Sequence, residues 1–255
     1  MLKFSANLSM LFRELPLLAR FVAARRSGFA AVEIQLPYEH STPTLRETLA
    51  NAGMPLVLIN APMGPDPRAP GMACRREHAA QFRDAIERAA DYAGALGVPC
   101  VNVLAGRAGA EEHTDCVRQL EEHLTLAAEL LAPAGARPLL EVINPIDVPG
   151  YCVSSFELAC EVLGRCDRRV GLQFDIYHAA RLGLDPRRAF EATRPAIAHI
   201  QFADCPGRHE PGTGTVPFAA IFAAIERSSY AGWVGAEYHP LETTAAGLHW
   251  LPRAQ

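Results

Sequence analysis

The chain has 255 residues, of which 49% are hydrophobic and 20% are charged, and its formal net charge is −4. This length and apolar content are enough for the full hydrophobic core of one α/β domain. The negative charge argues against nucleic acid as a partner, because binding to a phosphate backbone normally needs a positively charged face.

Short β-rich segments alternate with segments of helical periodicity along the chain. Apolar side chains recur at helical spacing from Phe82 to Leu96 and again from Val117 to Leu131. The spacing predicts eight strands: Leu2–Leu8, Ala31–Leu36, Leu56–Asn60, Cys100–Leu104, Pro138–Asn144, Val170–His178, Ile197–Asp204 and Trp233–Tyr238.

The ends of these strands recur about every 33 residues between Asn7 and Glu237, which suits a βα unit. Eight such units close naturally into a (β/α)8 barrel. The competing architecture is a doubly wound open sheet, which usually has a glycine-rich turn after the first strand, whereas this chain has SANLSMLF there. We therefore predict an α/β fold, a single TIM-barrel domain over residues 1–255.

The connection after the third strand, residues 61–73 (APMGPDPRAPGMA), is dense in proline and glycine. Loops that follow the strands of a barrel lie on its catalytic face. The segment is compatible with a lid over the site and equally with an inert surface loop.

Polar side chains interrupt four strands that should be apolar, because barrel strands are buried on both faces. They are Glu141 in PLLEVIN, Asp175 in GLQFDIYH, Gln201 in AHIQFAD and Glu237 in WVGAEYH. A nearby arginine or a loop cap would explain any one of them alone. Four at equivalent depth in neighbouring strands instead favour convergence on one cation. Carboxylate and amide oxygens suit Mg²⁺ or Mn²⁺, so we predict one divalent metal ion bound by these residues.

Further candidates follow the sixth and seventh strands. His178 comes three residues after Asp175 and either binds the substrate or has a role behind the metal ligands or in the loop. The string DCPGRHEPGTG, from Asp204 to Gly214, leaves Arg208, His209 and Glu210 to project from a backbone restrained by proline and glycine. An arginine there can clamp a substrate carboxylate, and we place His209 with it as substrate-binding. A phosphate cradle is the alternative, which the absence of a P-loop lysine disfavours.

Other chemistry and locations are disfavoured by what the sequence lacks. Lys3 is the only lysine and starts the first predicted strand, so Schiff-base and pyridoxal chemistry are excluded. The seven cysteines show no CxxC pair or zinc-finger spacing. No segment resembles a membrane span or a signal peptide. We expect a cytoplasmic protein without a membrane partner; a homo-oligomer is compatible with the sequence.

The residues resemble the hydroxypyruvate isomerase family, over nearly the whole chain. The related 2-oxo-tetronate isomerases share much of the pattern, and both belong to the xylose isomerase-like barrel superfamily. The resemblance rests on FSANLSMLF at Phe4–Phe12, PYE at Pro37–Glu39, INPIDVPGY at Ile143–Tyr151, FDIYH at Phe174–His178, PGRHEPGTG at Pro206–Gly214 and AGLHW at Ala246–Trp250.

The resemblance implies interconversion of hydroxypyruvate and 2-hydroxy-3-oxopropanoate (tartronate semialdehyde), a small hydroxy-oxo acid. By motif position, Glu141 and Glu237 are similar to the family's proton donor and acceptor, and Asp175 and Gln201 to the remaining metal ligands. Two departures lie on the substrate side: the segment from Gly64 to Ala73 is short and proline-rich, and Thr215 replaces a commonly acidic residue.

The mechanism that we infer is a glutamate-mediated proton transfer through an enediolate whose charge a metal stabilises. The alternatives are a 2-oxo-tetronate isomerase or sugar 3-epimerase on the same scaffold, an apurinic-endonuclease-like DNA repair enzyme, and a non-catalytic barrel. The repair enzyme is disfavoured because this chain has neither a histidine-rich multi-zinc site nor a basic groove.

Overall fold

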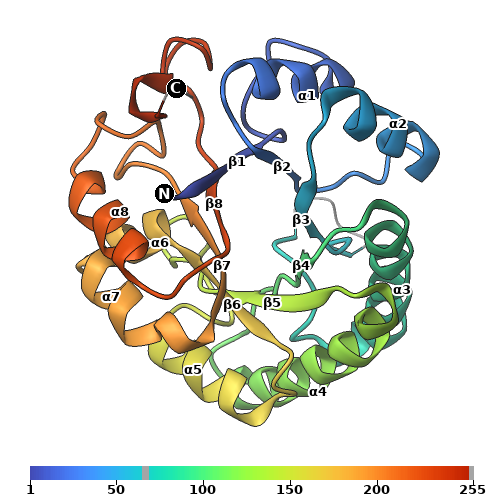
Figure 1. Cartoon of the computed structure of the whole chain (residues 1–255). Coiled ribbons are helices and arrows are strands. Elements are labelled where there is room, and N and C mark those ends of the chain that lie inside the picture. Colours follow the sequence, from blue (N-terminus) through green and yellow to red (C-terminus); the bar gives the residue numbers. More distant parts are fainter. Residues whose placement is uncertain (65–68, 253–255) are drawn as a thin grey trace. The chain divides into compact units, whose positions relative to one another are not determined.

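The computed structural model describes residues 1–64 and 69–252, and its strands follow one another in the order of a closed barrel, β1 to β8. Figure 1 labels the elements. Six pairs of neighbouring strands are parallel. The strands are β1 (Lys3–Asn7), β2 (Ala31–Ile34), β3 (Leu56–Asn60), β4 (Cys100–Asn102), β5 (Arg137–Glu141), β6 (Gly171–Asp175), β7 (Ile197–Phe202) and β8 (Trp233–Ala236).

The helices occupy the predicted intervals between the strands. The apolar stripes that begin at Phe82 and Val117 lie on α3 and α4, which confirms both helices. Gly53 and Gly97 end α2 and α3 with φ of +62° and +67°, a left-handed conformation that glycine adopts without a Cβ penalty. The helices are α1 (Leu17–Arg26), α2 (Thr42–Ala52), α3 (Ala79–Leu96), α4 (His113–Leu131), α5 (Phe156–Arg165), α6 (Ile176–Arg181), α7 (Pro186–Thr193) and α8 (Phe218–Arg227).

The chain divides into two compact units, whose boundaries fall within β3, β6 and β7. Unit 1 comprises Met1–Val57, Asp175–Arg194 and His199–Gln255. In it β1 pairs with both β2 and β8, and β8 pairs with β7. Trp250 of the AGLHW string packs edge-on against Phe4 and Phe202, at ring-centroid distances of 5.3 and 5.0 Å. This string therefore closes the core of unit 1.

Unit 2 comprises Leu58–Phe174 and Pro195–Ala198. In it β4 pairs with β3 and β5, and β5 pairs with β6. The helices α3 and α4 lie side by side (Figure 1). Buried Leu58, Cys100 and Leu139 pack with Ala198 into a small apolar cluster.

The structure corrects the carboxyl ends of several predicted strands, which stop two or three residues earlier, as β5 does at Glu141 rather than at Asn144. The largest correction follows β6. The sixth strand was expected to run to His178, but β6 ends at Asp175, and His178 lies on α6. The Asp175 side chain accepts a hydrogen bond from the Tyr177 backbone N–H at 2.8 Å and so caps the helix. A capping carboxylate that satisfies the first free N–H groups favours a helix over continued strand.

Three further expectations concern the chain as a whole. Residues 65–68, within the segment for which a lid and an inert surface loop were both left open, lie outside the described residues. In the described part of the chain, none of the helices combines the length and apolar character that a membrane crossing requires. The interpretation of residues 1–255 as a single domain stays a prediction.

Candidate active site

All four predicted metal ligands are buried and lie at the carboxyl ends of strands. Glu141 ends β5, Asp175 ends β6, Gln201 is the penultimate residue of β7, and Glu237 follows β8 directly. Asp175, Gln201 and Glu237 belong to unit 1, and Glu141 belongs to unit 2. Loops at this end of the strands carry the active site in TIM barrels.

The carboxylate of Glu237 is fully engaged within unit 1. Its Oε1 accepts hydrogen bonds from the amide nitrogens of Asn7 at 3.0 Å, Gln35 at 3.0 Å and Gln201 at 3.2 Å. Its Oε2 accepts one from Arg208 Nη2 at 2.6 Å. Three amide donors on one oxygen hold the carboxylate in place and leave Oε2 to the arginine.

Asp175 keeps an oxygen for another partner. Its Oδ2 is buried and receives no hydrogen bond from the described residues. The ring Nε2 of His178 and the guanidinium Nη2 of Arg208 lie 3.6 and 3.9 Å away. Burial raises the pKa of Asp175 to about 7, against the lowering effect of Arg208. A buried carboxylate oxygen without a donor is costly, and a bound cation would relieve that cost.

Arg208 lies between these two carboxylates. It has a φ of +56°, unusual for a residue with a side chain. Its guanidinium lies 5.0 Å from the centre of the Tyr177 ring, a cation–π distance. The sequence assigned this arginine to a substrate carboxylate; in the structure it neutralises Glu237. Of the four predicted ligands, Glu237 thus has the arginine partner that we considered as the alternative to a metal.

The loop after β7 is organised by Asp204. The buried carboxylate of Asp204 accepts backbone N–H groups of Cys205 at 2.9 Å, Gly212 at 2.8 Å, Gly214 at 2.9 Å and Val216 at 3.0 Å. A Cβ at Gly214 would overlap the Cys205 carbonyl, so only glycine fits. The loop is therefore held by its own carboxylate, as a rigid platform.

Two residues of this loop differ in role from the expectation that they project freely. Glu210 is buried, and its Oε2 accepts the Leu241 N–H at 3.1 Å, so it fastens the loop to the segment after β8. The ring Nδ1 of His209 lies 2.7 Å from the carbonyl oxygen of His239. The interpretation of Glu210 as a projecting group was wrong, and that of His209 as substrate-binding stays a prediction.

Glu141 is held by a residue that the strand pattern did not single out. Asn102 at the end of β4 donates its Nδ2 to Glu141 Oε2 at 2.7 Å. Tyr151 is buried in the same unit, and burial, followed by the charge of Glu141, raises its pKa well above the ordinary value. Glu141 is therefore a fixed carboxylate.

Glu33 was also missed. It is fully buried in β2, in the apolar sequence AVEI. The same signal that identified Glu141 and Glu237, a carboxylate within an apolar strand, was available for Glu33. Asn7 and Gln35 carried no comparable signal, because polar amides at strand ends are common in loops as well.

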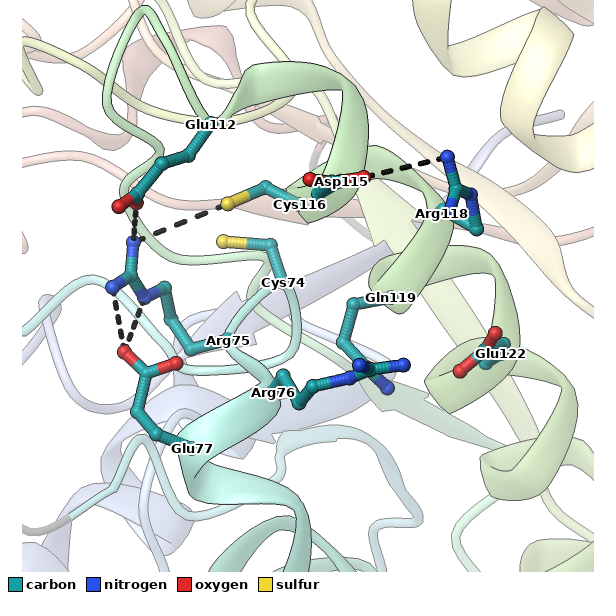
Figure 2. A pocket seen from close by; sticks show the side chains of 10 residues that line it. All are labelled: Cys74, Arg75, Arg76, Glu77, Glu112, Asp115, Cys116, Arg118, Gln119 and Glu122. Atoms are coloured by element: carbon teal, nitrogen blue, oxygen red, sulfur yellow. Dashed lines mark hydrogen bonds and ion pairs between the residues drawn. The ribbon is translucent and has the colours of Figure 1, made fainter.

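A pocket of about 490 Å³ lies elsewhere in unit 2, between the segment before α3 and the start of α4 (Figure 2). Its charges are paired locally: Arg75 bridges Glu77 and Glu112, and Arg118 meets Asp115. None of the predicted site residues lines it. It is lined by Cys74, Arg75, Arg76, Glu77, Glu112, Asp115, Cys116, Arg118, Gln119 and Glu122. Four acidic and three basic side chains line it, so it offers no excess of positive charge for an anionic substrate.

Comparisons with known proteins identify the family. The family model described as xylose isomerase-like TIM barrel matches residues 21–254. The chain is 38% identical to the hydroxypyruvate isomerase of Escherichia coli K12, over 98% of both chains. It is 37% identical to the 2-oxo-tetronate isomerase of Cupriavidus necator, over 98% of this chain and 97% of the relative.

A solved structure described as an AP endonuclease, family 2, from Brucella melitensis is 34% identical, with a TM-score of 0.94 and 98% of each chain covered. An epimerase structure, the 3-keto-D-glucoside 4-epimerase of E. coli, has a TM-score of 0.83 at 18% identity and bears on the fold alone. Because the family model covers most of the chain and the curated relatives match it end to end, the chain belongs to the xylose isomerase-like TIM barrel family and is an isomerase.

Proposed function

We propose that this isomerase interconverts hydroxypyruvate and 2-hydroxy-3-oxopropanoate by moving a proton between neighbouring carbons of the substrate. The end-to-end similarity to a hydroxypyruvate isomerase supports the substrate. The observation that carries the chemistry is the set of buried carboxylates at the strand ends, of which Asp175 has an oxygen without a hydrogen-bond donor among the described residues.

This set fits one divalent cation, Mg²⁺ or Mn²⁺, held by Glu141, Asp175, Gln201 and Glu237. Carboxylate and amide oxygens are the ligands that these hard cations prefer. Glu141, Asp175 and His178 are buried residues whose side chains offer atoms that a metal ion accepts. When bound, the cation supplies a Lewis acid for the negative charge that develops on the substrate oxygens.

Glu141 and Glu237 act as the general base and the general acid of the reaction. One removes the proton from the carbon that bears the hydroxyl group, which gives an enediolate, and the other returns a proton to the neighbouring carbon. Asn102 orients Glu141, and the amides of Asn7, Gln35 and Gln201 orient Glu237. Because these amides occupy Oε1 of Glu237, Oε2 is the oxygen that remains both for the cation and for the proton.

Arg208 provides the carboxylate recognition. Its Nη2 donates a hydrogen bond to Glu237 Oε2 in the structure. A substrate carboxylate is a competing partner with the same fork geometry. Transfer of the guanidinium from Glu237 to the substrate both binds the acid and uncovers Oε2 for proton transfer. His178 and His209 are assigned to the substrate side as predicted from the sequence.

Replacing Arg208 by glutamine is expected to lower kcat/KM for hydroxypyruvate by about 10- to 100-fold, the effect of losing a charge-assisted hydrogen bond. Most of the loss should appear as a higher KM, because the arginine binds a carboxylate that does not react. Steady-state kinetics measures this effect. The binding of dihydroxyacetone, which lacks the carboxylate, is the control: its inhibition constant should change much less. Equal losses for both compounds would contradict the assignment.

The proposed function is tested by turnover of hydroxypyruvate by the purified protein in deuterium oxide, followed by NMR. We expect formation of 2-hydroxy-3-oxopropanoate with solvent deuterium on the carbon that receives the proton. No turnover of hydroxypyruvate would refute the substrate. Turnover without any deuterium, with later exchange to solvent excluded, would favour a hydride shift over proton transfer.

A second candidate is isomerisation of a four-carbon 2-oxo-tetronate, which the 37% identity to the Cupriavidus necator enzyme favours. A higher kcat/KM for the four-carbon acid than for hydroxypyruvate would favour this candidate. A preference for a neutral sugar would indicate the sugar 3-epimerase alternative.

Similarity to the Brucella protein, described as an AP endonuclease, raises abasic DNA as a substrate. The net charge of −4 opposes it, and binding to abasic DNA at physiological salt would revive it.

A further inference from the structure

Glu33 is a buried carboxylate that the proposed mechanism does not use. It belongs to β2 in unit 1, and no part of it is exposed to solvent. A buried charge is retained in a fold only where partners compensate the loss of water. What surrounds Glu33 therefore shows what the carboxylate does.

Both of its oxygens have specific partners. Oε1 accepts a hydrogen bond from Ser5 Oγ at 2.6 Å and lies 2.8 Å from His199 Nε2. Oε2 accepts one from Gln201 Nε2 at 2.8 Å. Glu33 is thus a carboxylate of which both oxygens have polar partners.

The barrel makes room for this carboxylate. Ser5 of β1 and Gln201 of β7 both lie in register with Gly235 of β8. A Cβ at Gly235 would overlap the carboxylate of Glu33, so this position of β8 accommodates the side chain only because it is glycine. Three strands therefore combine to seat Glu33 beside Gln201.

The consequence for Gln201 follows from donor and acceptor chemistry. Gln201 Nε2 donates a hydrogen bond to Glu33 Oε2, so the group of the amide that faces Glu33 is its NH₂. The same Nε2 lies 3.2 Å from Glu237 Oε1. Both N–H groups of the amide are thereby directed at carboxylates, and the carbonyl oxygen of Gln201 is turned away from them.

We propose that Glu33 is a positioning residue that fixes the side-chain amide of Gln201 with its carbonyl oxygen presented to the divalent cation. This inference rests on the ligand set of the proposed function and adds a residue that contacts neither substrate nor metal. Outer residues that orient metal ligands typically change metal affinity by about 10- to 100-fold when they are mutated.

The test is the affinity of the protein for Mn²⁺. Metal-free protein is titrated with Mn²⁺, and binding is measured by calorimetry and by the EPR signal of the Mn²⁺ that remains free. Glu33→Gln has the same shape but can donate to the Gln201 oxygen, which allows the amide to turn. We expect its Kd for Mn²⁺ to rise by about 10- to 100-fold. Circular dichroism checks the fold. Glu33→Asp keeps the carboxylate on a shorter side chain, and its Kd for Mn²⁺ should lie between those of the native protein and Glu33→Gln. It replaces Glu33→Gln in the test if that variant does not fold.

A double-mutant cycle separates positioning from general damage. If Glu33 acts through Gln201, Glu33→Gln or Glu33→Asp should change the Mn²⁺ Kd less than about two-fold in a Gln201→Ala background, where no amide remains to orient. An unchanged Kd in the folded single variant, or an equal loss in both backgrounds, would overturn the proposal.

The same measurements distinguish the two levels of inference. If Gln201→Ala binds Mn²⁺ as tightly as the native protein, then the ligand set of the proposed function is wrong and the role of Glu33 falls with it. If Gln201→Ala weakens binding while the Glu33 variants do not, only the positioning role fails. Turnover of hydroxypyruvate by the native protein is independent of both outcomes.

Discussion

Replacing either Glu141 or Glu237 by glutamine should reduce turnover of hydroxypyruvate by about 100- to 10,000-fold, the usual contribution of a general acid or base. Glutamine has nearly the same shape as glutamate, but its amide does not accept or release a proton at neutral pH. In Glu237→Gln the oxygen is expected to remain toward Asn7, Gln35 and Gln201, because these three donors need an acceptor. The side chain would keep its position but could no longer accept or release a proton.

Steady-state kinetics and circular dichroism together measure this effect, since only a folded variant is informative. Glu226→Gln makes the same change at an exposed glutamate paired with the N-terminus and serves as the control, with native turnover expected. Full activity of purified Glu141→Gln or Glu237→Gln would rule out that glutamate as a proton carrier. A loss confined to KM would assign it to binding instead.

Chelation should abolish nearly all turnover, and Mg²⁺ or Mn²⁺ should restore it. Without a cation, the charge on the substrate oxygens loses its stabilisation, and the buried carboxylate of Asp175 loses its counter-ion. The metal should also raise the melting temperature, since a ligand at 100 times its Kd stabilises the folded state by about 2.7 kcal/mol. Activity that survives exhaustive chelation, with metal content confirmed by elemental analysis, would exclude a metal-dependent reaction.

Matched variants sharpen the chelation experiment. In Gln201→Ala the metal concentration for half-maximal recovery should rise, because one oxygen donor is lost. A variant of the Figure 2 pocket, Arg76→Gln, should recover at the native concentration, because Arg76 is bonded to Gln119 and is not one of the predicted ligands. Parallel shifts in both variants would indicate that the metal acts on stability rather than at the predicted site.

The alternation of strand and helix was readable from the sequence because it depends on local periodicity. The apolar stripes of α3 and α4 repeat at 3.6 residues per turn, and Gly97 at the end of α3 has the left-handed backbone that glycine readily adopts. The boundary after β6 was not readable, because GLQFDIYH is apolar on either side of Asp175 and its side chain can end a strand or cap a helix. Hydrogen bonding to the Tyr177 N–H decided for the helix.

The candidate site was predictable only in part, for a similar reason. A carboxylate inside an apolar strand stands out in any sequence, and this identified Glu141, Asp175 and Glu237. It would have identified Glu33 as well. The partners of these groups come from residues far away in the chain: Asn7 is 230 positions from Glu237, and Glu33 is 168 positions from Gln201.

By itself, then, the sequence determined the alternation of eight strands with helices and the residue types that its strand ends carry, because both follow from local pattern and from the cost of burying charge. Only the tertiary structure decided how those charges are compensated. It paired Arg208 with Glu237, used Asp204 and Glu210 to hold the loop after β7, and directed the amide of Gln201 toward Glu33. Compensation depends on which groups the closed sheet brings within hydrogen-bond distance, and no local pattern encodes that distance.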